Sequence, residues 1–191
     1  SLGKFKFRYF TNGSSEAIFH YLVYLKINQI CSAIYVLQGE YEGYKQYSKK
    51  LKIDIREVDL KQQDPNKLKK GVWFISNPSA RDGNIIENKE ILRICEAGHK
   101  VIMDCTYVGL TRKHLFDVSH PNILAVITSL SKPFGLFYYR IGFVFSREEM
   151  MTLRPNIWFK NIFSLIIADE IFSSFNIDYF YSHNFNTKFI C

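Results

Sequence analysis

One lysine, preceded by two hydroxyl side chains and followed by an arginine, is the part of this sequence best suited to chemistry. Ser129 and Ser131 precede Lys132, and Arg140 comes eight residues after the lysine. A lysine amine can form a Schiff base with an aldehyde, while hydroxyl and guanidinium groups bind phosphate. The segment therefore predicts a site for an aldehyde that carries its own phosphate, a description that pyridoxal 5'-phosphate fits.

A carboxylate and a phenol follow another apolar run. Asp104 ends the run 100–104, and Tyr107 comes three residues later. A buried carboxylate needs a cation or hydrogen-bond donors, and a protonated pyridine nitrogen would serve as the cation. Tyr107 could donate to a ring oxygen. An aspartate that caps the next turn is an equally good interpretation of this motif taken alone.

A glycine turn near the N-terminus leads into a predicted helix. The free N–H groups of Gly13, Ser14 and Ser15, together with the positive end of the helix dipole, would accept a phosphate. Taken alone, this segment is better explained as an ordinary helix cap with a nearby glutamate. Tyr41 and Tyr44 follow a strand and could stack on a flat ring, although a core or surface aromatic is the simpler interpretation for either one.

Composition restricts the class of protein. The 191 residues are 47% hydrophobic and carry a net charge of +7, which fits one substantial globular core. The basic excess contains no long run, so a solvated basic face is a simpler explanation than a nucleic-acid binder. No apolar run reaches membrane length, the histidines lack metal spacing, and we expect a cytoplasmic protein. The cysteines share no short spacing, which fits free thiols in a reducing compartment: Cys31, Cys95, Cys105 and Cys191.

Apolar strand-like runs alternate with helix-length segments. This pattern predicts an α/β fold with a mostly parallel sheet and helices on both faces. Ligands bind beyond the carboxyl ends of such strands, where Asn77, Asp104 and 129–132 fall. The expected strands are 30–37, 53–58, 72–76, 100–104, 123–129 and 141–146. The expected helices are 14–28, 42–51 and 87–97, and the loop 61–70 should close with a turn of helix.

The character of the chain changes after about residue 156. The segment 157–175 predicts a long helix, and the remaining stretch looks like an aromatic loop. We therefore expect a large cofactor-binding domain over 1–156. Residues 157–191 would then be a helix and an aromatic tail that lead toward an absent or reduced C-terminal domain.

These motifs, taken in order, resemble the large domain of the class I/II aminotransferases, which are fold-type I pyridoxal phosphate enzymes. The resemblance covers about 10–149, and the lysine-to-arginine spacing of eight matches the family. Its motifs are Gly13-Ser14-Ser15-Glu16-Ala17, the Tyr41 region, Ser76-Asn77-Pro78-Ser79, Asp104-x-x-Tyr107, Ser129-x-Ser131-Lys132 and Arg140-Ile141-Gly142.

The resemblance implies a pyridoxal phosphate-dependent aminotransferase that acts on an amino acid and forms a homodimer. Lys132 would form the Schiff base and then move the α-proton, Asp104 would pair with the pyridine nitrogen, and Tyr107 would contact the ring hydroxyl. Tyr41 would stack on the ring, and Asn77 is a candidate ring contact. The phosphate would be held by Gly13, Ser14, Ser15, Ser129, Ser131 and Arg140.

The chain also departs from the family pattern. Ala80 stands where a ring-contacting asparagine is usual, and family members are about twice as long, so the N-terminal segment and small C-terminal domain have no counterpart. The sequences around Tyr41 and around Asp104 are similar to those of the capreomycidine-synthase-like branch. That similarity would imply cyclisation or elimination on an arginine derivative. A truncated, non-catalytic module of the same fold and a basic nucleic-acid binder are two further hypotheses.

Overall fold

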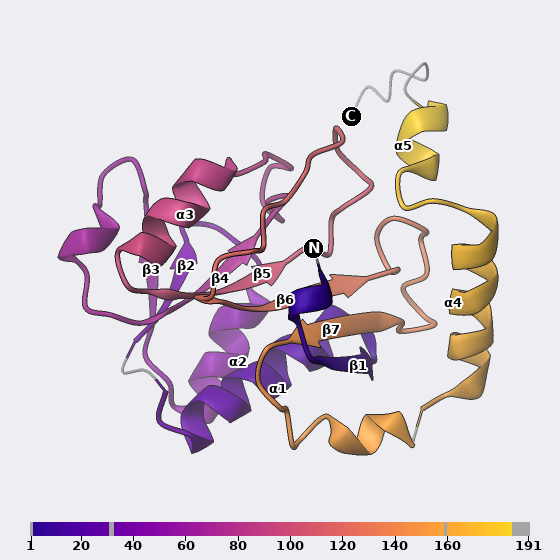
Figure 1. The fold of residues 1–191 in the computed structure, drawn as a ribbon, viewed down its shortest axis with the longest axis horizontal. Helices are drawn as coiled ribbons and strands as arrows, with labels where there is room; N and C mark the ends of the chain where they lie inside the picture. The colour runs from indigo at the N-terminus through magenta and orange to yellow at the C-terminus, as the bar shows by residue number, and fades with distance from the viewer. Residues whose placement is uncertain (1, 31–32, 159, 185–191) are drawn as a thin grey trace.

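A single seven-stranded sheet organises the molecule in the computed structural model, which describes residues 2–30, 33–158 and 160–184. The strands lie in the order β1-β7-β6-β5-β4-β2-β3 (Figure 1). The five strands from β6 to β3 run parallel, which confirms the predicted mostly parallel α/β fold. The bounds are β1 Phe7–Thr11, β2 Ile34–Leu37, β3 Ile55–Val58, β4 Val72–Ser76, β5 Lys100–Asp104, β6 Ile123–Ser129 and β7 Gly142–Ser146.

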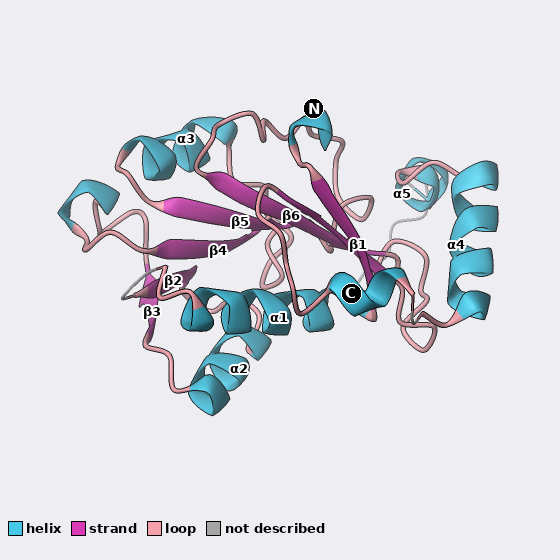
Figure 2. Ribbon diagram, turned by 60° about the horizontal axis from the view of Figure 1, so that its bottom comes forward, coloured by secondary structure: helices cyan, strands magenta, loops and turns pink. Residues whose placement is uncertain are grey.

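Helices cover both faces of the sheet. Figure 2 shows α1 (Gly13–Ile27) and α2 (Gly43–Leu51) on one side and α3 (Asn88–Glu96) on the other. Such two-sided cover explains why β4 is buried at all five positions and apolar at the first four, instead of alternating. The two short 3-10 turns η1 (Leu2–Lys4) and η2 (Pro65–Lys67) lie outside these layers, and η2 matches the helical turn predicted in the loop 61–70.

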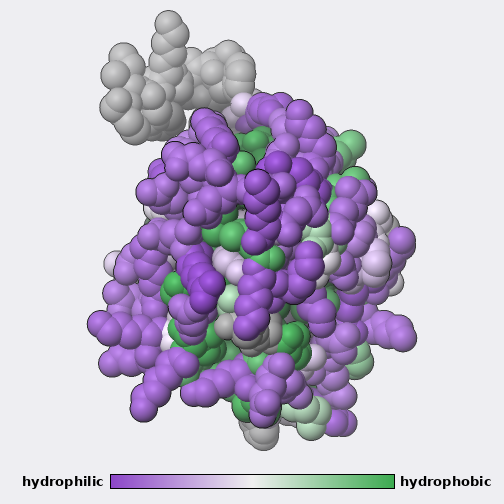
Figure 3. Space-filling model, turned by 90° about the vertical axis from the view of Figure 1, so that its left-hand side faces the viewer, coloured by the Kyte–Doolittle hydropathy of each residue, from purple (hydrophilic) through white to green (hydrophobic). Residues whose placement is uncertain are grey.

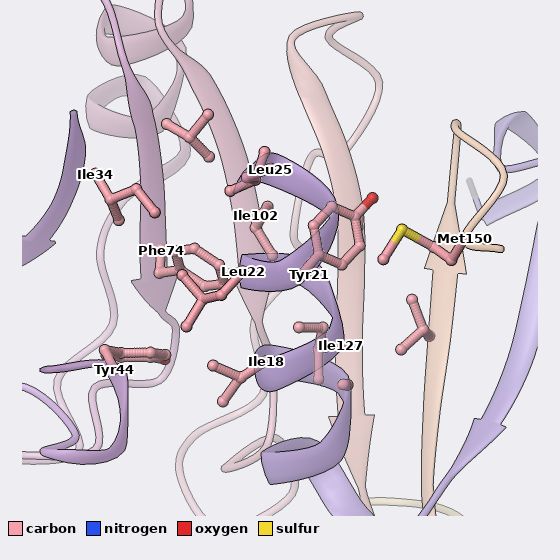
Figure 4. Close-up of a cluster of buried hydrophobic side chains, with 14 of the residues drawn as sticks. Ile18, Tyr21, Leu22, Leu25, Ile34, Tyr44, Phe74, Ile102, Ile127 and Met150 are labelled. Atoms are coloured by element: carbon pink, nitrogen blue, oxygen red, sulfur yellow. The ribbon is translucent and has the colours of Figure 1, made fainter. Parts of the chain in front are cut away.

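The hydrophobic core therefore has two layers. The α1 face packs against the sheet through Ile18, Tyr21, Leu22 and Leu25, which recur at the three- and four-residue spacing of one helix face (Figure 4). Across the sheet, Trp73 is completely buried among the residues beneath α3. Burial on both faces holds the parallel strands and the loops at their ends in place.

One end of the sheet differs from the prediction. β7 runs antiparallel to β6, and β1, which the sequence pattern did not reveal, runs antiparallel to β7. The reason is the connection 130–141, which contains turns but no crossover helix, so the chain returns beside β6 in the opposite direction. The strand expected over 30–37 begins at Ile34, and residues 31–32 of that range lie outside the described part of the chain.

The C-terminal part also differs from the prediction. The helix expected over 157–175 is α4, which runs only over Ile162–Ser174, because the Asn161 side chain caps it by accepting the Phe163 N–H. Before it, η3 (Arg154–Ile157) is a separate 3-10 turn. The tail was predicted as a loop, which is wrong for its first part, since α5 occupies Tyr179–Asn184.

Candidate active site

A cavity of about 230 Å³ opens where the carboxyl ends of several strands meet. Its walls come from the start of α1, the loops after β2 and β4, and the segments that follow β5 and β6. This is the edge at which an open α/β sheet binds ligands. The lining residues are Ser14, Ser15, Tyr41, Ala80, Asp104, Thr106, Tyr107, Ser131, Lys132, Phe137 and Arg140.

The N-terminus of α1 is left open toward this cavity. Asn12 occupies the cap position but its side chain makes no capping hydrogen bond to the helix. Ser14 and Ser15 both line the cavity. An uncapped N-terminus of a fifteen-residue helix offers free N–H donors and a partial positive charge, which suits an anion.

Arg140 lies directly against this helix start. Its Nη2 donates to the Asn12 carbonyl oxygen at 3.0 Å. Gly13 has a φ of +76°, and a Cβ there would lie 2.4 Å from Nη2, so only glycine permits this approach. A Cβ at Gly142 would meet Gly13 backbone atoms at 2.7 Å. Two glycines thus bring a guanidinium and a helix N-terminus to one anion-binding cradle.

Lys132 is placed between two aromatic rings. Its Nζ lies 5.6 Å from the centre of the Tyr107 ring and 5.3 Å from that of Phe137. Ser131, beside it, is braced by Ser129, whose hydroxyl accepts the Ser131 N–H at 3.1 Å and donates to the Ile141 carbonyl oxygen at 2.9 Å. The amine therefore stands in the same cavity as the Arg140 guanidinium.

Asp104 is the buried acid of the site, with only 4% of its surface exposed. Oδ2 accepts the Tyr44 hydroxyl at 2.6 Å, and Oδ1 accepts the hydroxyl of Thr106 at 2.6 Å and its N–H at 3.1 Å. Burial raises the pKa of Asp104 although these hydrogen bonds oppose the rise. Burial and the nearby Asp104 charge also raise the pKa of Tyr107, which keeps its phenol protonated and able to donate.

Eight of the eleven predicted site residues line the cavity, and three do not. Gly13 lies behind the Arg140 guanidinium, and Ser129 supports Ser131 from within the core. Asn77 is completely buried, and its side chain exchanges two hydrogen bonds with the backbone of Ile86, at 2.9 and 3.0 Å. The eight lining residues are Ser14, Ser15, Tyr41, Asp104, Tyr107, Ser131, Lys132 and Arg140.

Two residues that line the cavity, Thr106 and Phe137, were not predicted as site residues, and the contact between Tyr44 and Asp104 was not predicted either. Thr106 stands two residues after Asp104, a spacing at which a hydroxyl commonly bonds the preceding carboxylate, so it could have been found. Phe137 comes from a turn with no periodic pattern and gave no signal. Tyr44 was, like Tyr41, a candidate for stacking on a ring, but it does not line the cavity, and its hydroxyl contacts Asp104 instead.

The chemistry of this donor set suits pyridoxal phosphate. The Arg140 guanidinium, which lies against Gly13 at the open start of α1, matches a phosphate, and the Lys132 amine matches an aldehyde. Asp104, buried without an ion-pair partner among the described residues, matches a protonated ring nitrogen.

Other features bear on the remaining function classes. Within the described ranges, no three His, Cys, Asp or Glu side chains are grouped so that they could hold a metal ion. None of the helices described is long and apolar enough to cross a membrane. Cys95 and Cys105 are buried free thiols, whereas Cys31 and Cys191 lie outside the described residues.

Comparison with known sequences identifies the family. A model of the family "Aminotransferase class I and II" matches residues 4–174. The chain belongs to this family. A histidinol-phosphate aminotransferase of Thermotoga sp. (strain RQ2) is 28% identical over 156 residues, which are 78% of this chain and 46% of that protein. The chain thus spans about half the length of the curated relatives it matches.

Solved structures show the same fold. A protein of Methanococcus jannaschii, described as similar in its active site to kynurenine aminotransferases, matches with a TM-score of 0.73 and 21% identity, over 87% of this chain and 48% of that one. A C-S lyase of Staphylococcus hominis with bound pyridoxal phosphate matches with a TM-score of 0.73 and 14% identity, over 96% of this chain and 55% of that one. The fold is therefore that of a large part of a pyridoxal phosphate enzyme.

Proposed function

We propose that this chain is the cofactor-binding part of a pyridoxal phosphate-dependent aminotransferase that acts on an amino acid. The observation that carries the proposal is one cavity that holds a lysine amine, a buried carboxylate and a guanidinium beside a helix N-terminus. When bound, the cofactor would supply an aldehyde that reacts with amines and a ring that accepts an electron pair from a neighbouring carbon.

Each residue would have a separate task in this site. Lys132 would hold the cofactor at its aldehyde group through Nζ, and the same amine would move a proton during the reaction. Asp104 would hold the ring nitrogen in its protonated form, and Tyr107 would donate to the ring oxygen. Tyr41, whose hydroxyl lies 3.5 Å from that of Ser15, would cover the ring. Residues for the phosphate would be Gly13, Ser14, Ser15, Ser129, Ser131 and Arg140.

Asn77 stays a candidate ring contact that the geometry favours less. Both polar atoms of its side chain already bond the Ile86 backbone, and Ala80 lines the cavity without a polar side chain. Tyr107 would therefore be a more favourable polar contact for the ring than Asn77.

Transamination is the proposed outcome because several curated relatives are histidinol-phosphate aminotransferases. Lyases and a decarboxylase share the fold, so cyclisation or elimination on an arginine derivative, as in the capreomycidine-synthase-like branch, stays an alternative. A non-catalytic cofactor-binding module is a second alternative to the aminotransferase. The division into domains 1–156 and 157–191, the homodimer and the cytoplasmic location are parts of the same proposal.

The test is a titration with pyridoxal 5'-phosphate, followed by visible absorbance. We expect a new band in the native protein, and borohydride reduction followed by peptide mapping should place the label on Lys132. Lys132→Ala should abolish the band, whereas Lys89→Ala, which changes an exposed lysine on α3, should keep it.

The outcomes separate the alternatives. Absence of the band in the native protein would contradict every cofactor-dependent function, and a band that survives Lys132→Ala would contradict the role of this lysine. With a lysine-dependent band established, a panel of amino acids and histidinol phosphate should bleach it and yield a keto product if the chain is an active aminotransferase. No response to any amine would favour the non-catalytic module.

A further inference from the structure

Tyr44 is completely buried, and among the described residues its hydroxyl has one hydrogen-bond partner, the Asp104 carboxylate at 2.6 Å. Tyr44 belongs to α2, and its ring lies among core residues, with its centre 5.5 Å from that of Phe74 and 5.5 Å from that of Tyr41 (Figure 4). It does not line the cavity. Its polar atom therefore acts on the site only through Asp104.

Thr106 holds the opposite oxygen of the same carboxylate. Its hydroxyl and its N–H both donate to Oδ1, while Tyr44 donates to Oδ2. With both oxygens engaged from different elements, the carboxylate has one orientation, and the remaining lone pairs can face the cavity. Hydrogen bonds of this length to an ionised acceptor are among the stronger ones in proteins.

The electrostatics give these donors a function. Among the residues the structure describes, no Lys, Arg or His nitrogen forms an ion pair with Asp104. Burial raises the pKa of Asp104 and so favours the neutral acid, and the hydroxyls of Thr106 and Tyr44 favour the anion. Tyr44 itself stays a phenol, because burial and the Asp104 charge raise its pKa. The phenol is thus a permanent donor to this carboxylate.

We propose that Tyr44 is a positioning residue which, with Thr106, holds Asp104 as an oriented anion for a protonated ring nitrogen. The inference rests on the proposed function and names a residue outside the cavity on which that function depends. Without the Tyr44 hydroxyl, the carboxylate would lose one of its fixed donors and become a weaker partner for the ring nitrogen. Contacts to the phosphate and to the aldehyde would not change.

The experiment compares two ligands on the native protein and on Tyr44→Phe. The ligands are pyridoxal 5'-phosphate and its 1-deaza analogue, in which CH replaces the ring nitrogen, and binding is followed by absorbance. We expect Tyr44→Phe to weaken pyridoxal phosphate by about tenfold, the loss that follows from removing a hydrogen bond to a charged group. Binding of the deaza analogue should not change.

Two further variants make the comparison specific. Tyr21→Phe is the matched control, because Tyr21 is also completely buried in the same core layer and its hydroxyl bonds Ser146 at 2.7 Å, away from the site. It should leave both affinities unchanged. Thr106→Val tests the same carboxylate independently, should Tyr44→Phe fail to fold, and should also weaken pyridoxal phosphate more than the analogue.

Equal losses for both ligands in Tyr44→Phe, or no loss for either, would overturn the inference while the proposed function stands. An effect of Tyr21→Phe as large and as selective as that of Tyr44→Phe would overturn it too. Native protein that binds neither ligand would overturn the proposed function itself, and the inference with it. Selective loss in Tyr44→Phe against an unchanged Tyr21→Phe supports the assignment.

Discussion

Asp104 is the residue at which folding and the proposed chemistry make opposite demands. Its carboxylate is buried, lacks an ion-pair partner in the described ranges, and is compensated by neutral donors alone. Such a group lowers the stability of the ligand-free protein whenever it is ionised. A protonated ring nitrogen would supply the missing cation, so cofactor binding would relieve the cost.

The sign of this effect can be tested with Asp104→Asn in the cofactor-free protein. Because burial raises the pKa of Asp104, the folded state binds this proton more tightly, and its stabilising contribution is lost as the pH rises through the folded-state value. We expect the asparagine variant to be more stable by about 0.5–2 kcal/mol near pH 8. The difference should vanish below about pH 3, where the acid is protonated in both states.

Urea unfolding at both pH values measures this difference. A variant that is less stable than the native protein near pH 8 would contradict the argument. So would a stability difference that does not change with pH. Binding of pyridoxal phosphate should reverse the order of stability, because only the native protein keeps the anion.

At the scale of elements, the anion cradle depends on close approach between the start of α1 and the start of β7. Gly13 and Gly142 allow this approach, and Arg140 between β6 and β7 adopts a left-handed φ of 52° to place its side chain there. The sequence motif contains both glycines and the arginine. Their mutual contact arises only because β1 and β7 are paired in the sheet.

Gly13→Ala should weaken phosphate binding, and backbone strain at a positive φ should not be enough to explain the loss. A Cβ at this position displaces the Arg140 guanidinium and also strains a positive φ, so we expect a destabilisation of about 1–2 kcal/mol and much weaker binding of pyridoxal phosphate. The control is Gly83→Ala, where φ is +71° but the nearest atom would be 3.7 Å away. Absorbance titration should show weakened binding in Gly13→Ala alone; equal affinities in both variants would contradict the cradle.

A second contact between elements joins the first turn of α1 to the segment before α4. Lys160 and Glu16 form an ion pair at 3.2 Å, with side chains only 8% and 21% exposed. Burial opposes ionisation of Glu16, but the Asn12 N–H and Lys160 keep its pKa lowered. The ion pair therefore links the segment before α4 to α1, the helix that carries the proposed phosphate site.

Lys160→Met should destabilise the protein by about 1–3 kcal/mol near neutral pH, because it leaves a partly buried carboxylate without its cation. The contribution of a lowered carboxyl pKa is present above its ordinary value of about 4.3 and is lost as the pH falls through the folded-state value. The difference from the native protein should therefore disappear in acid. Lys45→Met, at a more exposed pair with Glu57, should change little; a Lys160→Met effect no larger than this would contradict the assignment.

At the scale of the whole molecule, the two ends of the sheet have different surfaces. The end that carries β3 and α3 is mostly hydrophilic (Figure 3). Along α4, at the other end (Figure 1), Ile162, Phe163, Ile166 and Phe172 are more than half exposed. An apolar cavity of about 710 Å³ separates part of this helix from β1 and β7. Exposed apolar surface of this kind is typical of an interface, which fits the proposed homodimer.

Phe163→Ser combined with Ile166→Ser tests this surface. The two side chains are 72% and 59% exposed, so the pair of changes should alter the free energy of unfolding by no more than about 1 kcal/mol. We expect the native protein to increase in mass with concentration in sedimentation experiments and the variant to stay monomeric. Ile27→Ser, at a 67% exposed side chain on α1, should associate like the native protein. A variant that still associates would contradict the role of α4 in the homodimer.

Much of the fold followed from local patterns. The strands over 72–76, 100–104 and 123–129 were predicted with their observed bounds, because continuous apolar runs with sharp polar ends specify buried strands. The direction of β7 and the presence of β1 were not predicted, since antiparallel pairing depends on how the connection 130–141 folds. Helix α4 was predicted too long, because its Asn161 cap was not recognised.

The amino-acid sequence alone determined which reactive side chains were available and at which edge of the sheet they would lie. Strand ends place their following residues at a common edge, so Asp104, Lys132 and Arg140 could be grouped from their positions along the chain. Only the tertiary structure decided how they are held. The Tyr44 hydroxyl reaches Asp104 across sixty residues of chain, and Gly13 meets Arg140 across the sheet edge, because packing of α2 and pairing of β1 bring them together. No local pattern encodes such contacts.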